Sequence, residues 1–292
     1  MTIIDRAATQ VSRLVRAAPR GELPAGRMVE LPGRGETFVT DSGDRDAPVI
    51  VLLHAVVTTG LLSWYPVIPR LAEEFRVITM DQRWHGRGIV SEEFRLDDCA
   101  DDVAALADVL GIDRFAVAGF SMGGGTAQLT WRRHHDRVSA LVLASTGSYF
   151  GRAGSGRAVV DQMAGSLLRL VRTPLRTISA EALDDTDISD GAWALRQVRS
   201  TRLSRVGEIG DELGRFRSGE WLAEIDVPTA VCVTTRDRVV PPSRQQLLVD
   251  GIPGARRFDV AAGHACCVLQ ADVFGPVFVQ ACTWAVDSAG AV

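Results

Sequence analysis

The chain of 292 residues contains no lysine, so all 32 of its basic residues are arginine. This absence excludes a lysine general base, a Schiff-base lysine and the lysine-dependent phosphate-binding loop of nucleotide hydrolases. Against 36 acidic residues the net charge is −4, which gives no electrostatic footprint for nucleic acid. A composition of 46% hydrophobic and 23% charged residues is typical of a globular protein that buries a substantial core.

Cysteine is scarce as well. The chain has five cysteines, an odd number, at spacings that suit no metal site, and we expect no secretory leader and no membrane-spanning segment. Reduced thiols in a cytoplasmic protein are therefore predicted. Because no cluster of His, Cys, Asp or Glu has the spacing of metal ligands, we expect neither a metal ion nor an organic cofactor.

A serine stands between glycines in the hexapeptide Gly-Phe-Ser-Met-Gly-Gly at residues 119–124. The apolar run 115–118 before it is typical of a strand, and residues 126–131 after it are typical of a helix. Ser121 is therefore predicted on a sharp, strained strand-to-helix turn at which no Cβ fits in place of the glycines. This motif, the nucleophile elbow, presents the Ser121 hydroxyl for attack and leaves the backbone N–H of Met122 free to stabilise an oxyanion.

A nucleophilic serine needs a base, and the base needs an acid that orients it. Asp237 follows the β-branched run 230–235, and His264 follows the strand-like run 256–260. Taken singly, Asp237 fits a helix cap and His264 an ordinary loop histidine. The chain order Ser, Asp, His is the order that the elbow motif requires, so the three residues together predict a catalytic triad. The other four histidines do not fit this order: His54, His85, His134 and His135.

Beyond residue 26, strand-like and helical segments alternate, which indicates a mostly parallel α/β sheet with helices on both faces. A helix is expected over 97–110. Eight strands are expected near residues 28–31, 36–40, 48–54, 75–81, 115–120, 138–145, 229–235 and 256–260.

The N-terminal segment, residues 1–26, is expected to form an amphipathic helix followed by a linker. Apolar residues recur at helical spacing between residues 3 and 18, and arginines occupy the opposite side. Packing of this helix on the domain is the preferred interpretation. Contact with a lid or a second protomer, and attachment to a membrane surface, stay open, as does the choice between a monomer and a homodimer.

These motifs resemble those of the α/β-hydrolase superfamily over about residues 36–285. The elbow, Asp237 and Gly263-His264 match the family's three catalytic motifs, and Leu52-Leu53-His54 is similar to its strand ending in His-Gly. The segment 79–88 resembles the family's Asp-x-Arg-Gly-His-Gly-x-Ser. Within the family, the chain looks most like the capped serine esterases, lactonases and cofactor-free haloperoxidases.

The resemblance implies an eight-stranded, mostly parallel core over residues 27–146 and 223–292, with a helical cap over residues 147–222. The cap is expected to contain helices at 158–171, 180–183, 192–198 and 206–216. In the family such a cap covers the serine and shapes the substrate pocket. Candidate pocket residues are Trp84, Phe120, Met163, Leu167, Trp193 and Cys266, although packing is the preferred interpretation for Cys266.

Two departures from the family pattern bear on the site. Ala55 replaces the glycine of His-Gly, next to Val56, whose backbone N–H is implied as the second oxyanion donor. Alanine fits there only if its φ is negative, since a positive φ costs about 1–2 kcal/mol. Trp84 also stands where the family has glycine, and we expect it to pack beside the mouth of the site.

The predicted reaction is transfer of an acyl group to water, with a small ester, lactone or thioester as substrate. His264 is the expected base, Asp237 its orienting acid, and the N–H groups of Val56 and Met122 the oxyanion hole. Three alternatives stay open. The same triad serves cofactor-free haloperoxidases or perhydrolases, it serves acyltransferases or carbon–carbon hydrolases, and the scaffold also carries catalytically weak binding proteins.

Overall fold

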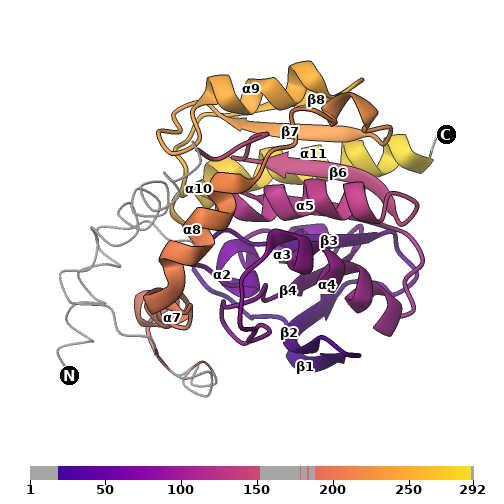
Figure 1. Ribbon diagram of the computed structural model, residues 1–292. Coiled ribbons are helices and arrows are strands. Elements are labelled where there is room, and N and C mark those ends of the chain that lie inside the picture. The colour runs from indigo at the N-terminus through magenta and orange to yellow at the C-terminus, as the bar shows by residue number, and fades with distance from the viewer. Residues whose placement is uncertain (1–18, 152–177, 179–182, 184–187, 291–292) are drawn as a thin grey trace.

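A central sheet of eight strands organises the molecule (Figure 1). The computed structural model describes residues 19–151, 178, 183 and 188–290. The strand order is β1-β2-β4-β3-β5-β6-β7-β8; β1 and β2 form an antiparallel hairpin, β2 is antiparallel to β4, and all other neighbours are parallel. The strands are β1 (Gly26–Leu31), β2 (Gly35–Ser42), β3 (Val49–Leu53), β4 (Arg76–Met80), β5 (Phe115–Phe120), β6 (Val138–Ala144), β7 (Thr229–Thr234) and β8 (Arg256–Val260).

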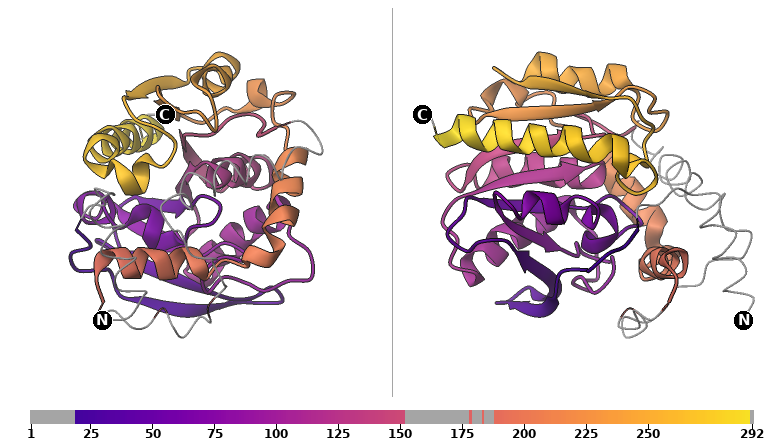
Figure 2. Two further views of the ribbon diagram at one scale, coloured as in Figure 1. Left: turned by 90° about the vertical axis from the view of Figure 1, so that its left-hand side faces the viewer. Right: turned by 180° about the vertical axis from the view of Figure 1, so that it is seen from behind.

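Helices cover both faces of this sheet, and two hydrophobic clusters fill the space beneath them (Figure 2). Because side chains alternate along a strand, Ile50 and Leu52 of β3 join one cluster while Val51 and Leu53 join the other. On the first face lie α2 (Gly60–Trp64), α3 (Ile68–Leu71), α10 (Cys266–Leu269) and α11 (Ala271–Gly290). On the second lie α4 (Leu96–Val109), α5 (Met122–Arg133) and α9 (Pro242–Gly251).

The predicted strands and core helices are confirmed. Every expected strand is present within two residues of its expected bounds, and the expected helix 97–110 is α4. The sheet is mostly parallel, with helices on both faces, as predicted. The alternation of apolar runs was sufficient because each buried parallel strand is a short β-branched segment between polar turns.

Between β6 and β7 the chain leaves the sheet, and two of the helices expected there are described. These are α7 (Asp190–Arg199) and α8 (Val206–Arg215), which lie across the edge where the parallel strands end (Figures 1 and 2). Ile209 and Leu213 of α8 are fully buried, and the backbone N–H of Arg202 donates to the carbonyl oxygen of Trp84 at 3.0 Å. The insertion therefore packs directly on the core.

Some predictions for the N-terminal segment and for the first part of the insertion between β6 and β7 fall outside the described residues. The N-terminal helix within residues 1–18 is one, and the helix 158–171 with Met163 and Leu167 is another; of the expected helix 180–183 only Leu183 is described. The domain boundaries at residues 26, 146 and 222 stay predictions. Within the described ranges, no helix combines the length and apolar character needed to cross a lipid bilayer.

Candidate active site

Ser121 occupies the sharp turn between β5 and α5 with φ of 53° and ψ of −115°. The predicted strain and close packing are confirmed. A Cβ on Gly119 would lie 2.1 Å from the carbonyl oxygen of Gly123, and a Cβ on Gly123 would lie 2.1 Å from that of Leu53. The turn is held by a 2.9 Å hydrogen bond from the backbone N–H of Ser121 to the carbonyl oxygen of Ala144. The Ser121 hydroxyl does not cap the helix.

The structure brings Ser121, His264 and Asp237 together although 143 residues separate the first two in sequence. His264 Nε2 lies 3.0 Å from Ser121 Oγ, and His264 Nδ1 lies 2.7 Å from Asp237 Oδ2. Because a carboxylate only accepts, Nδ1 carries the proton and Nε2 is left to accept from the Ser121 hydroxyl. Ser121 and the Asp237 side chain are fully buried, while 11% of the His264 side chain is exposed.

Asp237 is held by more donors than the sequence indicated. Its Oδ1 accepts from the backbone N–H groups of Val239 at 2.8 Å and Val240 at 3.0 Å. Its Oδ2, the oxygen that faces His264, also accepts from the Thr234 hydroxyl at 2.9 Å. The carboxylate is thus oriented from both sides before the histidine is considered.

Gln245, in the first turns of α9, is fully buried and holds two residues next to Asp237, Thr234 and Val240. Its Oε1 accepts from the backbone N–H of Thr234 at 3.0 Å, and its Nε2 donates to the carbonyl oxygen of Val240 and to Thr234 Oγ1 at 2.9 Å. The Thr234 hydroxyl therefore bridges Gln245 and Asp237, and it also lies 3.1 Å from Ser145 Oγ. Sequence reasoning missed Thr234 and Gln245, since only the fold places α9 behind β7.

The expected oxyanion donors lie where two elements approach each other. Met122 is the first residue of α5, and Val56 lies in the loop after β3; neither N–H donates to an acceptor in the described part of the chain. The loop after β3 is fixed at Ala55, whose carbonyl oxygen accepts from His54 Nδ1 and from the Thr58 hydroxyl, each at 2.7 Å. The backbone that carries the Val56 N–H is therefore rigidly supported.

His54 has a structural role at this loop. Its Nε2 accepts from the backbone N–H of Gln82 at 2.8 Å, so the ring is the neutral tautomer with its proton on Nδ1. Burial, together with the nearby His85, holds the pKa of His54 well below its usual value. The Gln82 side chain donates to the carbonyl oxygen of His54 at 2.8 Å and accepts from the Thr126 hydroxyl at 2.8 Å, which ties the loop to α5.

The backbone strain near the site is not at Ala55. Among the described residues, the non-glycine residues with positive φ are Val57, Trp84, Ser121 and Ser145, so Ala55 takes the place of glycine without a left-handed conformation. Trp84, by contrast, has φ of 66°, which explains why the family pattern has glycine there. The cost of that conformation, about 1–2 kcal/mol, is offset by burial of its indole, which stands 5.4 Å from the ring of Phe94 and donates to Ser91.

Of the pocket candidates that the structure describes, Phe120, Trp84 and Cys266 lie in the hydrophobic core, and Trp193 lines a cavity. Phe120 is buried beside His264, with ring centroids 5.7 Å apart, and Trp84 is 2% exposed. Cys266 is fully buried, as the packing interpretation expects, and burial raises the pKa of its thiol well above the usual value. All five cysteines are free and buried. Trp193 lines a cavity, considered below, whose described walls include none of Ser121, Asp237 and His264.

We expect Ala55→Gly to change kcat/KM for an ester by less than about threefold. The reason is that Ala55 already has an unstrained φ and its carbonyl oxygen is held by two donors, so glycine relieves nothing at the Val56 N–H. Initial rates with a p-nitrophenyl ester measure the effect. A gain of roughly tenfold or more, equivalent to about 1.4 kcal/mol, would show that alanine compromises the oxyanion hole.

The sheet order, the elbow and the position of the three side chains define an α/β-hydrolase fold, and the comparisons with known proteins agree. A family model described as the alpha/beta hydrolase fold matches residues 48–180. The chain therefore has the fold of the α/β-hydrolase superfamily.

Relatives within that superfamily include lactonases and esterases. The chain is 24% identical over 248 residues to 3-oxoadipate enol-lactonase 1 of Acinetobacter baylyi, covering 84% of this chain and 92% of that protein. It is 38% identical over 112 residues to a bifunctional esterase/perhydrolase of Acinetobacter calcoaceticus, covering 38% of this chain and 41% of the relative. The crystal structure of the enol-lactonase from Burkholderia xenovorans superposes with a TM-score of 0.71 at 25% identity, covering 88% of this chain and all of that one.

Proposed function

We propose that the protein is a serine hydrolase that cleaves a carboxylic ester, lactone or thioester through an acyl-enzyme on Ser121. The observation that carries this proposal is the unbroken chain of hydrogen bonds from Ser121 through His264 to Asp237. The kinship with enol-lactonases and esterases supports the same class of substrate. A small molecule with an acyl group is the proposed partner.

In the first half of the reaction, His264 Nε2 takes the proton of Ser121 while Oγ forms a bond to the carbonyl carbon. The N–H groups of Val56 and Met122 stabilise the oxyanion, and each such donor typically lowers the barrier by ~3 kcal/mol. His264 then gives the proton to the leaving oxygen or sulfur, and the carbonyl re-forms as the acyl-enzyme.

In the second half, His264 removes a proton from water, which attacks the acyl carbon. The collapse of this second tetrahedral intermediate breaks the bond to Ser121 Oγ, which recovers its proton from His264. Asp237 keeps the proton of the resting histidine on Nδ1 and stabilises the imidazolium during both steps. The carboxylic acid is released.

A serine-directed fluorophosphonate tests the first step directly. We expect one equivalent to attach to Ser121, located by peptide mass spectrometry, and to abolish turnover of p-nitrophenyl esters of graded chain length. Stoichiometric labelling with no turnover of any ester would favour a catalytically weak binding protein. Absence of labelling at Ser121 would contradict the proposed function.

Perhydrolysis is the second candidate, because one relative is named an esterase/perhydrolase. In that reaction hydrogen peroxide replaces water as the acceptor of the acyl group, and a peracid is released. Comparing peracid and acid formed from the acyl-enzyme at increasing peroxide concentration separates the two reactions. Alcohol acceptors in the same assay test for acyltransferase activity.

Thr234→Val should lower kcat by roughly tenfold with little change in KM, because a hydrogen bond to a charged group is worth about 1.5–3 kcal/mol. Thr234→Ser keeps the hydroxyl and should restore kcat. If the valine variant loses only thermal stability, its hydroxyl does not act on Asp237.

A further inference from the structure

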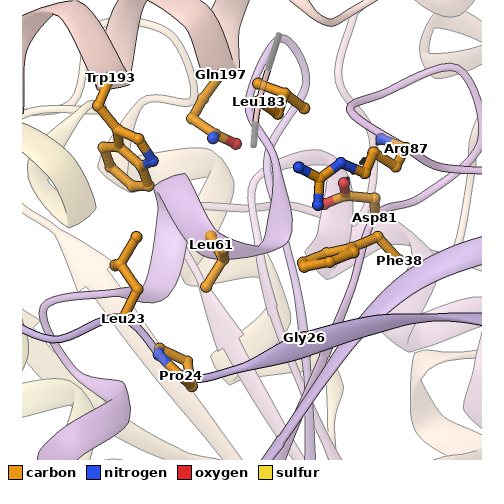
Figure 3. A pocket seen from close by; sticks show the side chains of 10 residues that line it. All are labelled: Leu23, Pro24, Gly26, Phe38, Leu61, Asp81, Arg87, Leu183, Trp193 and Gln197. Carbon is orange, nitrogen blue, oxygen red and sulfur yellow. Dashed lines mark hydrogen bonds between the residues drawn. The ribbon is translucent and has the colours of Figure 1, made fainter. Parts of the chain in front are cut away.

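A cavity of about 270 Å³ lies beneath α7 on the side of the sheet that carries β2 and β4 (Figure 3). Its described walls come from the segment before β1, from the start of β1, from β2, from α2, from the loop after β4, from Leu183 and from α7. Among the described residues, none of the proposed catalytic ones lines it. The lining includes Leu23, Leu61, Asp81, Arg87, Trp193 and Gln197.

Two hydrogen-bond donors on α7 point into this cavity. Trp193 and Gln197 are four residues apart, so their side chains leave the same face of the helix (Figure 3). They are only 2% and 4% exposed. Gln197 Oε1 accepts from the Thr59 hydroxyl at 2.6 Å, which fixes the amide and turns its Nε2 to the other side. Neither Nε2 of Gln197 nor Nε1 of Trp193 donates to any acceptor in the described ranges of the chain.

The wall across from these donors includes the Asp81 carboxylate and the Arg87 guanidinium. Asp81 Oδ1 accepts from the backbone N–H of Gly60 at 2.8 Å, and Oδ2 accepts from that of Arg87 at 2.9 Å. Burial raises the pKa of Asp81 to about 6, against the opposing effect of these two N–H donors. The Arg87 guanidinium stacks 4.5 Å above the ring of Phe38. Figure 3 shows the Asp81 and Arg87 side chains beside each other.

The charged groups at this wall are already engaged within the chain. Both Asp81 oxygens accept backbone hydrogen bonds, and Arg87 stacks on Phe38 and has a further partner. A charged ligand would therefore give up its hydration without gaining an unpaired counter-charge, which favours a neutral occupant. The rest of the lining is largely apolar, with Leu23, Leu61 and the Trp193 ring among its members. A cavity with two donors that have no acceptor among the described residues, charged groups that are already engaged, and apolar walls matches a ligand with one strong acceptor on an apolar body.

We propose that this cavity is a binding site, separate from Ser121, for a small uncharged carbonyl compound such as an amide, ester or lactone. The carbonyl oxygen accepts from Trp193 Nε1 and Gln197 Nε2, and the apolar body packs against Leu23 and Leu61. The site does not depend on the proposed hydrolase activity, because no bond of the ligand is made or broken there.

Phenylacetamide is a suitable probe, since it is neutral, carries a carbonyl oxygen and is not an ester. The chain has six tryptophans, so a ¹H–¹⁵N spectrum of the indole groups resolves the site without any assay of activity. We expect the Trp193 indole signal, assigned with Trp193→Phe, to move on titration to saturation. The stacked Trp131 and Trp221 should stay unchanged and serve as internal controls.

Matched variants then test the contacts. Trp193→Phe keeps a ring against Tyr65 but removes the N–H, and Gln197→Glu keeps an acceptor for Thr59 but removes the amide donor. We expect each to weaken phenylacetamide binding by at least fivefold, measured by ligand-observed NMR, while Trp221→Phe leaves it unchanged. The anion phenylacetate should bind the unaltered protein at least tenfold more weakly.

Three results would overturn the proposal. The first is a Trp193 signal that stays fixed at the highest soluble concentration of phenylacetamide. The second is movement of the Trp64 signal alone, because Trp64 packs on Phe120 beside His264 and would report binding near Ser121. The third is unchanged affinity in both variants. None of these results bears on fluorophosphonate labelling of Ser121. The binding site beneath α7 and the hydrolase function can therefore be refuted independently of each other.

Discussion

Replacing Ser121 by alanine is expected to lower kcat/KM for ester hydrolysis by roughly 10⁴- to 10⁶-fold and to abolish fluorophosphonate labelling. The variant removes the only oxygen that lies within hydrogen-bond distance of His264 Nε2 among the described residues. The hydroxyl does not cap α5, and alanine accepts the same backbone geometry as serine at this turn. The melting temperature should therefore change by no more than a few degrees.

Ser243→Ala is the matched control for this experiment. Ser243 is an exposed serine on α9, and its substitution should leave both activity and labelling unchanged. Initial rates with a p-nitrophenyl ester and intact-protein mass spectrometry measure the two effects. More than a few per cent of residual activity in purified Ser121→Ala would contradict the assignment of the nucleophile.

The second large effect is expected for Asp237→Asn, at roughly 10⁴-fold in kcat. The physical reason lies in the two backbone donors at Oδ1. Val239 and Val240 both direct N–H groups at this oxygen, so an asparagine must place its own oxygen there and its NH₂ group toward His264. His264 Nδ1 must then accept, which moves the ring proton to Nε2. In that tautomer the histidine cannot take the proton of Ser121.

Asp259→Asn provides the comparison, because Asp259 is an exposed carboxylate on β8 that pairs with Arg257. We expect that variant to keep its activity, with kcat measured at saturating ester for both proteins. A loss of less than tenfold in Asp237→Asn would mean that another carboxylate orients His264. Fluorophosphonate labelling of Asp237→Asn should still reach Ser121, but far more slowly.

Much of the fold could be predicted from the sequence because its signals are local. Each parallel strand is a short apolar run between polar turns, and the elbow glycines permit a turn that other residues cannot adopt, as the 2.1 Å approaches at Gly119 and Gly123 show. The order Ser121, Asp237, His264 sufficed to place the three residues at one edge of the sheet. Parallel strands deliver the residues after their carboxyl ends to the same edge.

Other features depend on contacts between segments far apart in the chain, and no local pattern marks them. The sequence directed attention to Ala55, whereas the positive φ values are at Val57 and Trp84, where the loop after β3 and the segment after β4 are held by packing. Gln245 reaches Asp237 only because α9 lies against β7. The cavity beneath α7 combines residues from positions 23 to 197, so neither its shape nor its lining could be inferred from sequence.

By itself, the sequence determined the sheet and the strained serine turn, since each is encoded within a few neighbouring residues. It also named the candidate nucleophile, base and acid that the proposed experiments test. Only the tertiary structure decided how these groups are supported. It supplied the donors on both oxygens of Asp237, the neutral His54 that holds the Ala55 carbonyl, and the placement of the Trp193 and Gln197 donors at one cavity. Hydrogen-bond direction and burial are properties of pairs of segments, and the pairing exists only once the chain has folded.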